Sequence, residues 1–526
     1  MIHRSPAPDV DIPVVSLPDY VFEHARQWAD KPALIDGPSG RTLTYGQLIG
    51  AASRLAGALA ARGFGTGDVF AIFSPNLPEY AIVFFGVQWA GGVVTTTNPT
   101  YTKDELGHQL KDAGAKYLIT IPHFLEPARA AAEEAGVEEL FVFGEAEGAT
   151  PLAALLAEGG DRPALDLDPQ SDLAVQPYSS GTTGLPKGVM LTHYNLVANI
   201  AQTLAVEQME TEEVLIGILP FYHIYGMIVI LSMALRKGTT IITMPRFDLE
   251  QFLGLMQDHK VTTAFVVPPI ILALAKHPVV DQYDLSALEQ IVSGAAPLPE
   301  ATASGCAERL GCAVRQGYGL TETSPVTHFI PRNREIKVTS VGFPVPNTEV
   351  RIVDVGTDNN LGTDEPGEIW IRGPQVMKGY HNNPEATRDM IDEAGWLHTG
   401  DIGYVDDDGY FYVIDRVKEL IKYKGLQIAP AELEAVLQGH PAVADAAVIP
   451  SPDEEAGEVP KAFIVRKPGS EASAEDIQAY VAERVAPYKK VRRVEFIEQI
   501  PKVPSGKILR RELVKREREK MVDGRE

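Results

Sequence analysis

Residues 178–188, with the sequence YSSGTTGLPKG, are the segment best suited to holding a phosphate group. Glycines let a backbone turn tightly and approach a ligand closely, and successive backbone N–H groups beside hydroxyls form a concave site for phosphate oxygens. The segment is not a Walker A loop, because Gly188 rather than Ser or Thr follows Lys187. A flexible surface loop is the alternative, but an apolar run begins at once with Val189–Leu191. We therefore predict a phosphate-binding loop whose candidate residues are Ser179, Ser180, Gly181, Thr182, Thr183, Gly184 and Lys187.

A second candidate segment is QGYGLTET, residues 316–323. It lacks the third glycine of a dinucleotide-binding fingerprint, so the Gly-x-Gly pattern alone is weak evidence. The segment gains weight from Tyr318 between two glycines, followed by Thr321 and Glu322. A hard cation prefers oxygen ligands, so Glu322 is a candidate metal ligand. The competing interpretation is a glycine-rich turn before a helix that starts at a threonine.

Two single residues stand out by their surroundings. His223 lies between aromatic residues in PFYHIYG, where an isolated histidine is more often a satisfied core residue than a catalytic one. Lys507 lies in PSGKILRREL, where Pro, Ser and Gly would place it on a loop tip. Its ammonium is a compact charge able to follow a phosphate or carboxylate oxygen. The competing interpretation of Lys507 is a solvated lysine, because many basic residues follow it.

Composition excludes several classes of function. The chain has 526 residues and a formal net charge of −24, from 47 basic and 71 acidic side chains, which argues against a nucleic-acid partner. Its two cysteines, Cys306 and Cys312, suit neither a zinc site nor a disulfide framework, and we expect both to be packing residues. With no signal-peptide pattern at the N-terminus, we expect a cytoplasmic protein.

One segment is long enough to cross a membrane. Residues 214–235 contain no Lys, Arg, Asp or Glu. Pro220, Tyr222, His223 and Tyr225 lie within it, however. We therefore expect a buried strand, a turn and a buried helix, and no integral membrane segment.

The pattern of apolar runs predicts an α/β fold combined with α+β parts. Before residue 348 or so, short apolar runs such as Val69–Phe73 and Thr263–Val267 alternate with helical patterns such as Tyr45–Ala61, which is typical of parallel sheets with crossover helices. Strands and hairpins follow, including an Asp-Gly turn at 408–409. A fresh α+β pattern begins after Asp415. We predict a large domain over 1–415, with parallel α/β sheets and a β-rich subdomain, and a small mobile α+β domain over 416–526.

Motifs along nearly the whole chain resemble those of the adenylate-forming superfamily of acyl-CoA synthetases, adenylation domains and luciferases. They run from TLTYGQL (Thr42–Leu48) through the loop at 178–188 to SGKILRREL (Ser505–Leu513). The resemblance is strongest to 4-coumarate–CoA ligases, through NPTYTKDEL (Asn98–Leu106), PFYHIYG (Pro220–Gly226) and VKELIKYKGLQIAPAELE (Val417–Glu434). It implies a ligase that joins a carboxylic acid to CoA through an acyl-adenylate, with ATP and CoA as co-substrates and Mg²⁺ as cofactor.

The resemblance also implies roles for individual residues. It assigns catalysis to Lys507, His223, Thr183, Lys422 and Gln427, the metal to Glu322, the hinge between domains to Lys418, and the CoA passage to Lys424 and Gly425. To ATP or AMP binding it assigns, besides the loop residues above, Ala296, Gln316, Gly317, Tyr318, Thr321, Asp401 and Arg416. To the acyl pocket it assigns Ile224, Tyr225, Ile228, Phe265, Val292, Gly294, Ala295, Gly319, Pro325, Val326 and Thr327.

The identity of the acid stays open at this point. Val292 stands where plant ligases often carry lysine, and Ile228 where some carry asparagine, so the pocket is expected to be more apolar than theirs. The acid is expected to be 4-coumarate or a related arylpropenoic acid. A medium-chain fatty acid is the first alternative, and a stand-alone enzyme that loads a carrier protein is the second. A luciferase-type oxygenase and a non-catalytic nucleotide sensor are weaker alternatives, and the oligomeric state is open.

Overall fold

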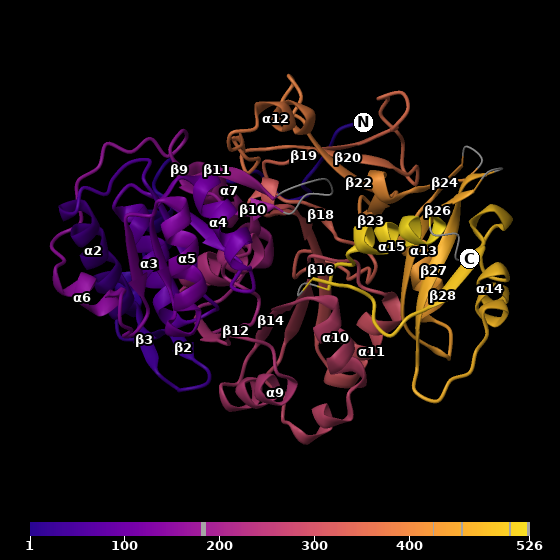
Figure 1. The fold of residues 1–526 in the computed structure, drawn as a ribbon, viewed down its shortest axis with the longest axis horizontal. Helices are drawn as coiled ribbons and strands as arrows, with labels where there is room; N and C mark the ends of the chain where they lie inside the picture. The colour runs from indigo at the N-terminus through magenta and orange to yellow at the C-terminus, as the bar shows by residue number, and fades with distance from the viewer. Residues whose placement is uncertain (180–185, 424–425, 454–455, 504–505, 523–526) are drawn as a thin grey trace.

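The computed structural model describes residues 1–179, 186–423, 426–453, 456–503 and 506–522. The first of its two large sheets is built from the N-terminal part of the chain (Figure 1). Its central strands are parallel. Successive side chains of β4 (Val69–Phe73) pack alternately against two layers of helices, one on each face of the sheet. Phe70 and Ile72 join the core of α2 and α3, whereas Ala71 and Phe73 join that of α4 and α5. In spatial order the strands are β10 (Tyr178–Ser179), β11 (Lys187–Thr192), β9 (Leu173–Val175), β5 (Val93–Thr97), β4 (Val69–Phe73), β6 (Ala115–Thr120), β7 (Glu139–Val142) and β8 (Thr150–Pro151), with β21 (Gly379–Tyr380) beside β11.

Two of the longer helices around the first large sheet begin at threonines that cap them. Thr44 and Thr102 form capping boxes with Gln47 and Glu105, which satisfy otherwise unpaired N–H groups at the starts of α2 and α4. The helices are α1 (Leu17–Phe22), α2 (Tyr45–Ala61), α3 (Pro78–Trp89), α4 (Lys103–Ala113), α5 (Leu125–Ala135) and α6 (Leu152–Ala157), with 3₁₀ turns at Ala25–Trp28 and Pro122–Phe124.

The second large sheet carries the middle of the chain and one pair of early strands. The strands from Val214 (the start of β12) to Gly319 (the end of β16) are parallel to their neighbours among them. Strand β2 (Pro32–Asp36) pairs in parallel with β13 (Thr240–Thr243), although about two hundred residues of sequence separate them. In spatial order the strands are β18 (Phe343–Pro344), β17 (Val326–Phe329), β16 (Ala313–Gly319), β15 (Gln290–Ser293), β14 (Thr263–Val266), β12 (Val214–Gly217), β13 (Thr240–Thr243), β2 (Pro32–Asp36) and β3 (Thr42–Thr44).

Helices follow the strands of this sheet and cover it (Figure 1). A π-helix, η3 (Tyr225–Ser232), precedes α8, and such helices are rare and often mark functional sites. The other elements are α7 (His193–Glu207), α8 (Met233–Lys237), α9 (Leu249–Asp258), α10 (Pro268–Lys276) and α11 (Glu300–Leu310), with 3₁₀ turns at Pro278–Gln282 and Thr321–Thr323 (η5). The segment 214–235 is thus a strand, a turn and two helices, as expected. In the described part of the chain no helix is both long and apolar enough to span a bilayer.

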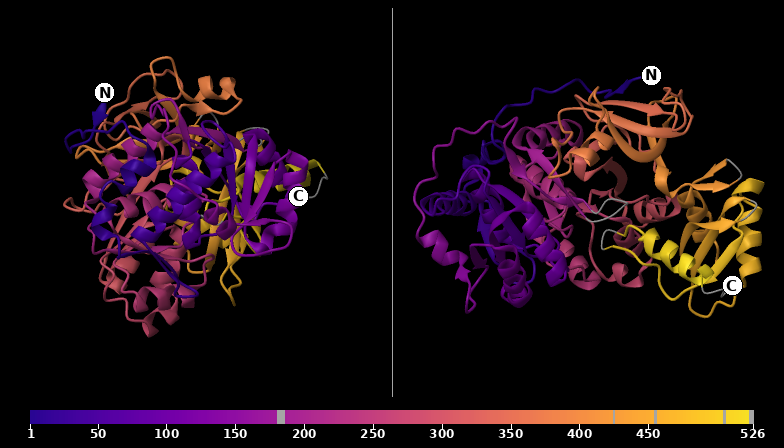
Figure 2. Two further views of the ribbon diagram at one scale, coloured as in Figure 1. Left: turned by 90° about the vertical axis from the view of Figure 1, so that its left-hand side faces the viewer. Right: turned by 45° about the horizontal axis from the view of Figure 1, so that its top comes forward.

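Two smaller sheets complete the molecule. An antiparallel sheet contains β1 (His3–Arg4), β19 (Glu349–Val353), β20 (Gly367–Arg372), β22 (Leu397–Val405) and β23 (Phe411–Arg416), with α12 (Pro384–Met390) beside it. The C-terminal sheet contains β25 (Leu426–Ile428), β24 (Ile421–Tyr423), β27 (Gly457–Arg466), β26 (Val443–Asp453) and β28 (Arg493–Phe496), with α13 (Pro430–Gln438), α14 (Ala474–Ala482) and α15 (Arg510–Val522); 3₁₀ turns lie at Val417–Glu419 and Pro487–Lys489. Figure 2 shows these C-terminal elements as a body at one end of the molecule.

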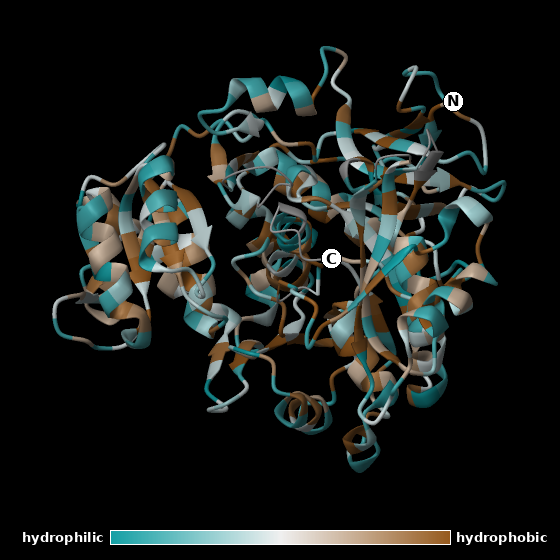
Figure 3. Ribbon diagram, turned by 45° about the vertical axis from the view of Figure 1, so that its right-hand side comes forward, coloured by the Kyte–Doolittle hydropathy of each residue, from teal (hydrophilic) through white to brown (hydrophobic). Residues whose placement is uncertain are grey.

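The hydropathy of the ribbon follows this architecture. Apolar residues concentrate in the strands of the sheets, while polar residues dominate the outer loops and helix faces (Figure 3). The C-terminal sheet has its own apolar core, which includes Ile421, Leu433, Val448 and Ile464. Cys306 and Cys312 are both buried and unpaired, as expected of packing residues. The predicted fold class, α/β sheets with a β-rich subdomain and a C-terminal α+β part, is confirmed.

Candidate active site

Tyr318, Asp401 and Arg416 form a hydrogen-bonded group where the β-rich sheet meets the second large sheet. The Tyr318 hydroxyl, at the end of β16, donates to Oδ2 of Asp401 at 2.6 Å. Arg416 Nε lies 3.2 Å from the other oxygen, Oδ1, and register pairs these two residues on β22 and β23. Burial raises the pKa of Asp401, and Arg416 opposes that rise. Tyr318 and Arg416 thus hold the Asp401 carboxylate in place, and its remaining lone pairs can accept hydrogen bonds from hydroxyl groups.

Glu322 is linked through Tyr380 to Lys187 on the strand that follows the predicted phosphate-binding loop. It lies on η5 and is 6% exposed, and its Oε1 accepts a 2.8 Å hydrogen bond from Tyr380. Nζ of Lys187, the first residue of β11, lies 4.9 Å from the centre of the Tyr380 ring. Tyr380 therefore holds the predicted metal ligand and the predicted phosphate-binding lysine on the same side of the site.

His223 follows β12 in the turn before η3. Its Nδ1 accepts the backbone N–H of Tyr225 at 3.3 Å, so in the neutral ring Nε2 carries the proton. Burial, and secondly the charge of Lys507, lowers the pKa of His223 to about 4. Although protein surrounds much of the imidazole, the side chain is exposed to solvent. At neutral pH His223 is therefore an uncharged donor facing an accessible space.

Lys507 reaches this region from the C-terminal elements. It follows Gly506, whose N–H donates to the Val503 carbonyl at 2.8 Å. Burial and the neighbouring charge of Arg416 lower the pKa of Lys507, while Glu419, Asp401 and Glu322 act in the opposite direction. Lys507 thus shares its electrostatic surroundings with the residues already described, which come from segments about a hundred or more residues away in sequence.

Three residues predicted to line the acyl pocket, Phe265, Val292 and Gly294, lie against Tyr225. Its ring packs edge-on to Phe265 with centroids 6.5 Å apart, and its hydroxyl donates to the Val292 carbonyl at 3.3 Å. A Cβ on Gly294 would lie 2.8 Å from that ring, so only glycine fits there. The side chains of Ile224, Ile228, Phe265, Val292 and Val326 are buried, and register pairs Gly319 with Val326. Ala295 has φ of +69°, a strained conformation typical of functional sites.

Other predicted residues have mainly structural surroundings. Gln316 donates to the Val338 carbonyl at 2.6 Å, and a Cβ on Gly317 would meet the Phe329 ring at 2.9 Å. Thr321 begins η5, and Ala296 follows the strained Ala295. Ser179 pairs with Lys187 in the β10–β11 hairpin.

The structure does not bring every predicted residue to the site. Lys422 pairs with Gln427 on the β24–β25 hairpin, at one edge of the C-terminal sheet, and its N–H donates to Glu458 at 2.8 Å. Ser180, Gly181, Thr182, Thr183, Gly184, Lys424 and Gly425 lie outside the described residues, as do the side chains of Lys418 and Gln427.

Two residues near the site are absent from the sequence-based prediction. Tyr380 contacts both Glu322 and Lys187, but it lies in a Gly-Tyr pair after β20 that belongs to none of the motifs described above. Glu419 acts on Lys507 and pairs with Arg510. The one available signal was its position inside the VKEL motif beside Arg416.

Comparison with known proteins identifies the family of this chain. Residues 21–381 match the family model described as AMP-binding enzyme, and residues 432–507 match the model of the AMP-binding enzyme C-terminal domain. The chain belongs to the AMP-binding enzyme family. This AMP-binding enzyme is 44% identical over 524 residues to 4-coumarate–CoA ligase 2 of Petroselinum crispum, covering 98% of this chain and 96% of that one. It is 43% identical over 523 residues to 4-coumarate–CoA ligase of Pinus taeda, covering 97% of each.

Solved structures of the family have the same fold. ATP-bound MatB from Rhodopseudomonas palustris is 29% identical and superposes with a TM-score of 0.88, over 96% of this chain and 99% of that chain. The anthranilate CoA ligase AuaEII in complex with anthranoyl-AMP is 26% identical, with a TM-score of 0.89 over 96% and 98% of the two chains. The AMP-binding enzyme described here therefore shares its architecture with proteins crystallised with a nucleotide or an acyl-adenylate.

Proposed function

We propose that this protein is an ATP-dependent carboxylate–CoA ligase that forms an acyl-adenylate and acts on 4-coumarate or related arylpropenoic acids. The observation that carries the proposal is the convergence of Asp401, Arg416, Glu322, His223 and Lys507 on one side of the second large sheet. Two carboxylates, a neutral imidazole and the Lys507 ammonium act on one another electrostatically there, which supports binding of a ribose, a metal and a reacting anion. These are the groups that joining a carboxylate to a nucleotide requires.

The first half-reaction brings two anions together. A carboxylate oxygen attacks the α-phosphorus of ATP, and the bond to pyrophosphate breaks. Asp401 accepts from the ribose hydroxyls, and Arg416 holds Asp401 in place. The Lys507 ammonium and the Nε2–H of His223 stabilise negative charge that develops on the reacting oxygens, and donors already in place need no reorganisation as that charge develops. The loop residues 180–184 hold the phosphates.

The residues present fit a Mg²⁺ ion held mainly by substrate. Within the described ranges no group of three or more His, Cys, Asp or Glu side chains is placed to hold a metal. Mg²⁺ is typically bound by one or two carboxylates together with substrate phosphates and water. Glu322, buried and oriented by Tyr380, would supply that single carboxylate. When bound, the ion would neutralise charge on the phosphate oxygens.

The second half-reaction needs other residues. The CoA thiol attacks the acyl carbonyl and AMP leaves. Lys422, Gln427, Lys424 and Gly425 are proposed to act here, after the domain formed by residues 416–526 rotates against residues 1–415 about Lys418. Two features support an alternation. Lys507 lies near His223, and the β24–β25 hairpin lies on another part of the same C-terminal body.

The pocket supports a second candidate substrate. Val292 is 1% exposed and apolar, and Ile228 is equally buried, so these walls offer no hydrogen bond to a distal group of the acid. A medium-chain fatty acid would therefore fit the same walls. Tyr225 favours the arylpropenoic acid, because its ring can pack against an aromatic substrate.

A panel of acids with ATP, CoA and Mg²⁺ tests the proposal. The expected products are AMP, pyrophosphate and an acyl-CoA, with 4-coumarate or cinnamate giving the highest kcat/KM. A higher value for hexanoate or octanoate would favour the second candidate. Formation of ADP and phosphate with the preferred acid would refute an adenylate-forming ligase.

A further inference from the structure

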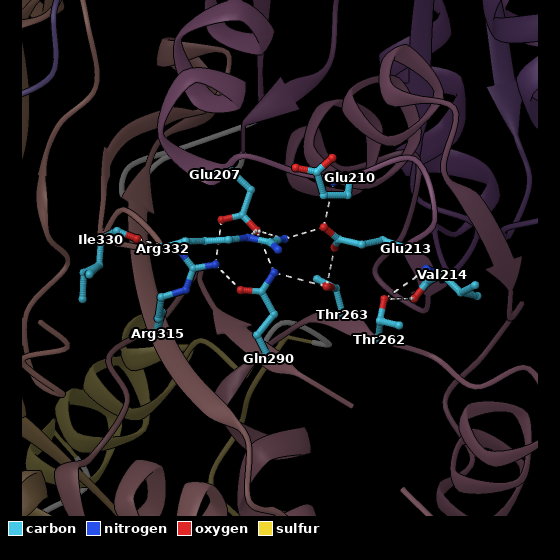
Figure 4. A network of polar contacts seen from close by, with 10 residues as sticks. All are labelled: Glu207, Glu210, Glu213, Val214, Thr262, Thr263, Gln290, Arg315, Ile330 and Arg332. Atoms are coloured by element: carbon cyan, nitrogen blue, oxygen red, sulfur yellow. Dashed lines mark hydrogen bonds and ion pairs between the residues drawn. The ribbon is translucent and has the colours of Figure 1, made fainter. Parts of the chain in front are cut away.

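A buried network of charged and amide side chains lies on the same sheet face as the acyl pocket. Glu207 at the end of α7 accepts from Gln290 Nε2 at 2.8 Å, from Arg332 Nη2 at 2.9 Å and from Arg315 Nη2 at 2.7 Å. Glu213 accepts from Arg332 Nη2 and from the Thr263 hydroxyl, at 2.7 and 2.6 Å. Figure 4 shows these side chains converging from α7, the sheet and the loop before β12.

Strand register places Gln290 and Thr263 below Val292 and Phe265, whereas Arg315 is level with Val292 and its side chain extends to Gln290. Gln290 and Val292 are two residues apart on β15 (Gln290–Ser293), so their side chains share one face of the sheet. Register pairs Thr263 with Gln290, Phe265 with Val292, and Val292 with Arg315. At roughly 3.3 Å per residue, Gln290 and Thr263 lie about 6.6 Å deeper along the strands than Val292 and Phe265. The reacting groups lie at the opposite, carboxyl ends of these strands.

The network is saturated rather than open to a ligand. Arg315 also donates to the Ile330 carbonyl at 2.7 Å and to the Gln290 side-chain oxygen, and Gln290 donates to Thr263 at 3.1 Å. Two carboxylates face two guanidinium groups, and Glu207 and Arg315 are 0% and 2% exposed. An entering methylene could not replace these hydrogen bonds, and breaking them would leave buried charges without partners.

We propose that Glu207, Gln290 and Arg315 form the closed polar end of the acyl pocket and thereby set the maximum length of the acid. The inference rests on the proposed ligase function. Acids whose far end stops at Phe265 and Val292 are accepted. Longer acids are rejected because they would have to displace the Gln290 amide from Glu207 and Arg315.

The variant Gln290→Ala tests this length limit, because it removes the amide while the Glu207–Arg315 and Glu207–Arg332 ion pairs remain possible. Each buried methylene contributes about fourfold to binding, so space for two more should raise kcat/KM for octanoate relative to hexanoate by roughly 15-fold over the wild-type ratio. Gln290→Asn, which keeps the amide but is one methylene shorter, should shift the limit by a single carbon. It also provides the test if Gln290→Ala does not fold.

The matched control is Gln202→Ala, which removes an equally buried amide from α7 that bonds to Pro346 and Gln375 instead. It should leave the length profile as in the wild type. If neither Gln290 variant changes the octanoate-to-hexanoate ratio while AMP-forming activity persists, or if Gln202→Ala changes it equally, the network is not the end of the pocket. If the wild type makes acyl-CoA from no acid of the panel, the proposed function fails and this inference with it.

Discussion

A methyl group added at Gly506 should separate the two half-reactions. Gly506 has φ of +84° and directly precedes Lys507. In the structure a Cβ at this position would lie 2.6 Å from Cγ and 2.8 Å from Cδ of Pro269, in the first turn of α10. Pro269 belongs to the second large sheet's helices, so this overlap exists only while the Lys507 loop is docked against them.

Gly506→Ala has two energetic costs, and they act on different arrangements of the Lys507 loop. The left-handed backbone costs an alanine roughly 1–2 kcal/mol, and the loop bears this cost in every arrangement. The overlap with the Pro269 ring costs about 1–3 kcal/mol, as overpacking typically does, and acts on the docked arrangement alone. Adenylation should therefore slow by about 5- to 150-fold although the Lys507 ammonium is retained.

Each half-reaction can be measured separately. ATP–pyrophosphate exchange with the preferred acid reports adenylation, and consumption of a supplied acyl-adenylate with CoA reports thioester formation. We expect Gly506→Ala to slow the first and leave the second within about twofold, since the loop has left Pro269 by then. Pro269→Ala removes Cγ and Cδ and should restore exchange in the double variant. Equal slowing of both half-reactions, or no rescue by Pro269→Ala, would refute the reasoning.

Three further predictions concern charge and pH. Burial and Arg416 lower the pKa of Lys507, so the adenylation rate should fall as the pH rises through that lowered pKa. Lys507→Arg should move this alkaline limit to higher pH in the pyrophosphate-exchange assay. A limit at the same pH would assign the titration to another group. Val292→Lys places an ammonium in a buried apolar wall beside Arg315, and should lower kcat/KM for both hexanoate and cinnamate more than tenfold; unchanged values would exclude Val292 from the pocket. Burial lowers the pKa of His193 to about 4, so between about pH 6.5 and pH 4 the folded state binds fewer protons than the unfolded state. The free energy of unfolding that neutral His193 contributes is therefore complete above this window and is lost as the pH falls through it. His193→Gln, which can still accept the Leu17 N–H, should make the urea midpoint less sensitive to pH across this window, whereas identical slopes would contradict the assignment.

Local elements could be predicted well where one signal dominated. The helix Tyr45–Ala61 and the strand Val69–Phe73 have the bounds that hydrophobic periodicity indicates, and a threonine cap fixes the start of the helix. Strand β26 extends beyond the apolar run Val443–Ile449 to Asp453. Pro450 cannot donate to the ladder, but it pairs opposite Pro460 of β27, and the ladder continues through neighbouring residues.

The active site was predictable as parts rather than as an arrangement. Motifs named Glu322, Asp401 and Lys507, because their neighbours are distinctive. Nothing local in the sequence indicates that Tyr380 supports Glu322, or that Arg315 in a buried strand finds Glu207 a hundred residues earlier. Those contacts depend on strand order, and strand order depends on packing of the whole sheet.

The pairing of β2 with β13 constrains how the protein can be made on the ribosome. The strands β4 to β8 lie within residues 69–151 and can assemble early, whereas Pro32 meets its partner Thr240 only 208 residues later. At synthesis rates of about 5–20 residues per second, residues 32–44 must wait roughly 10–40 s for that partner. During this interval an apolar strand remains without its neighbour, and it is the segment for which we expect chaperone binding to matter most in the nascent chain.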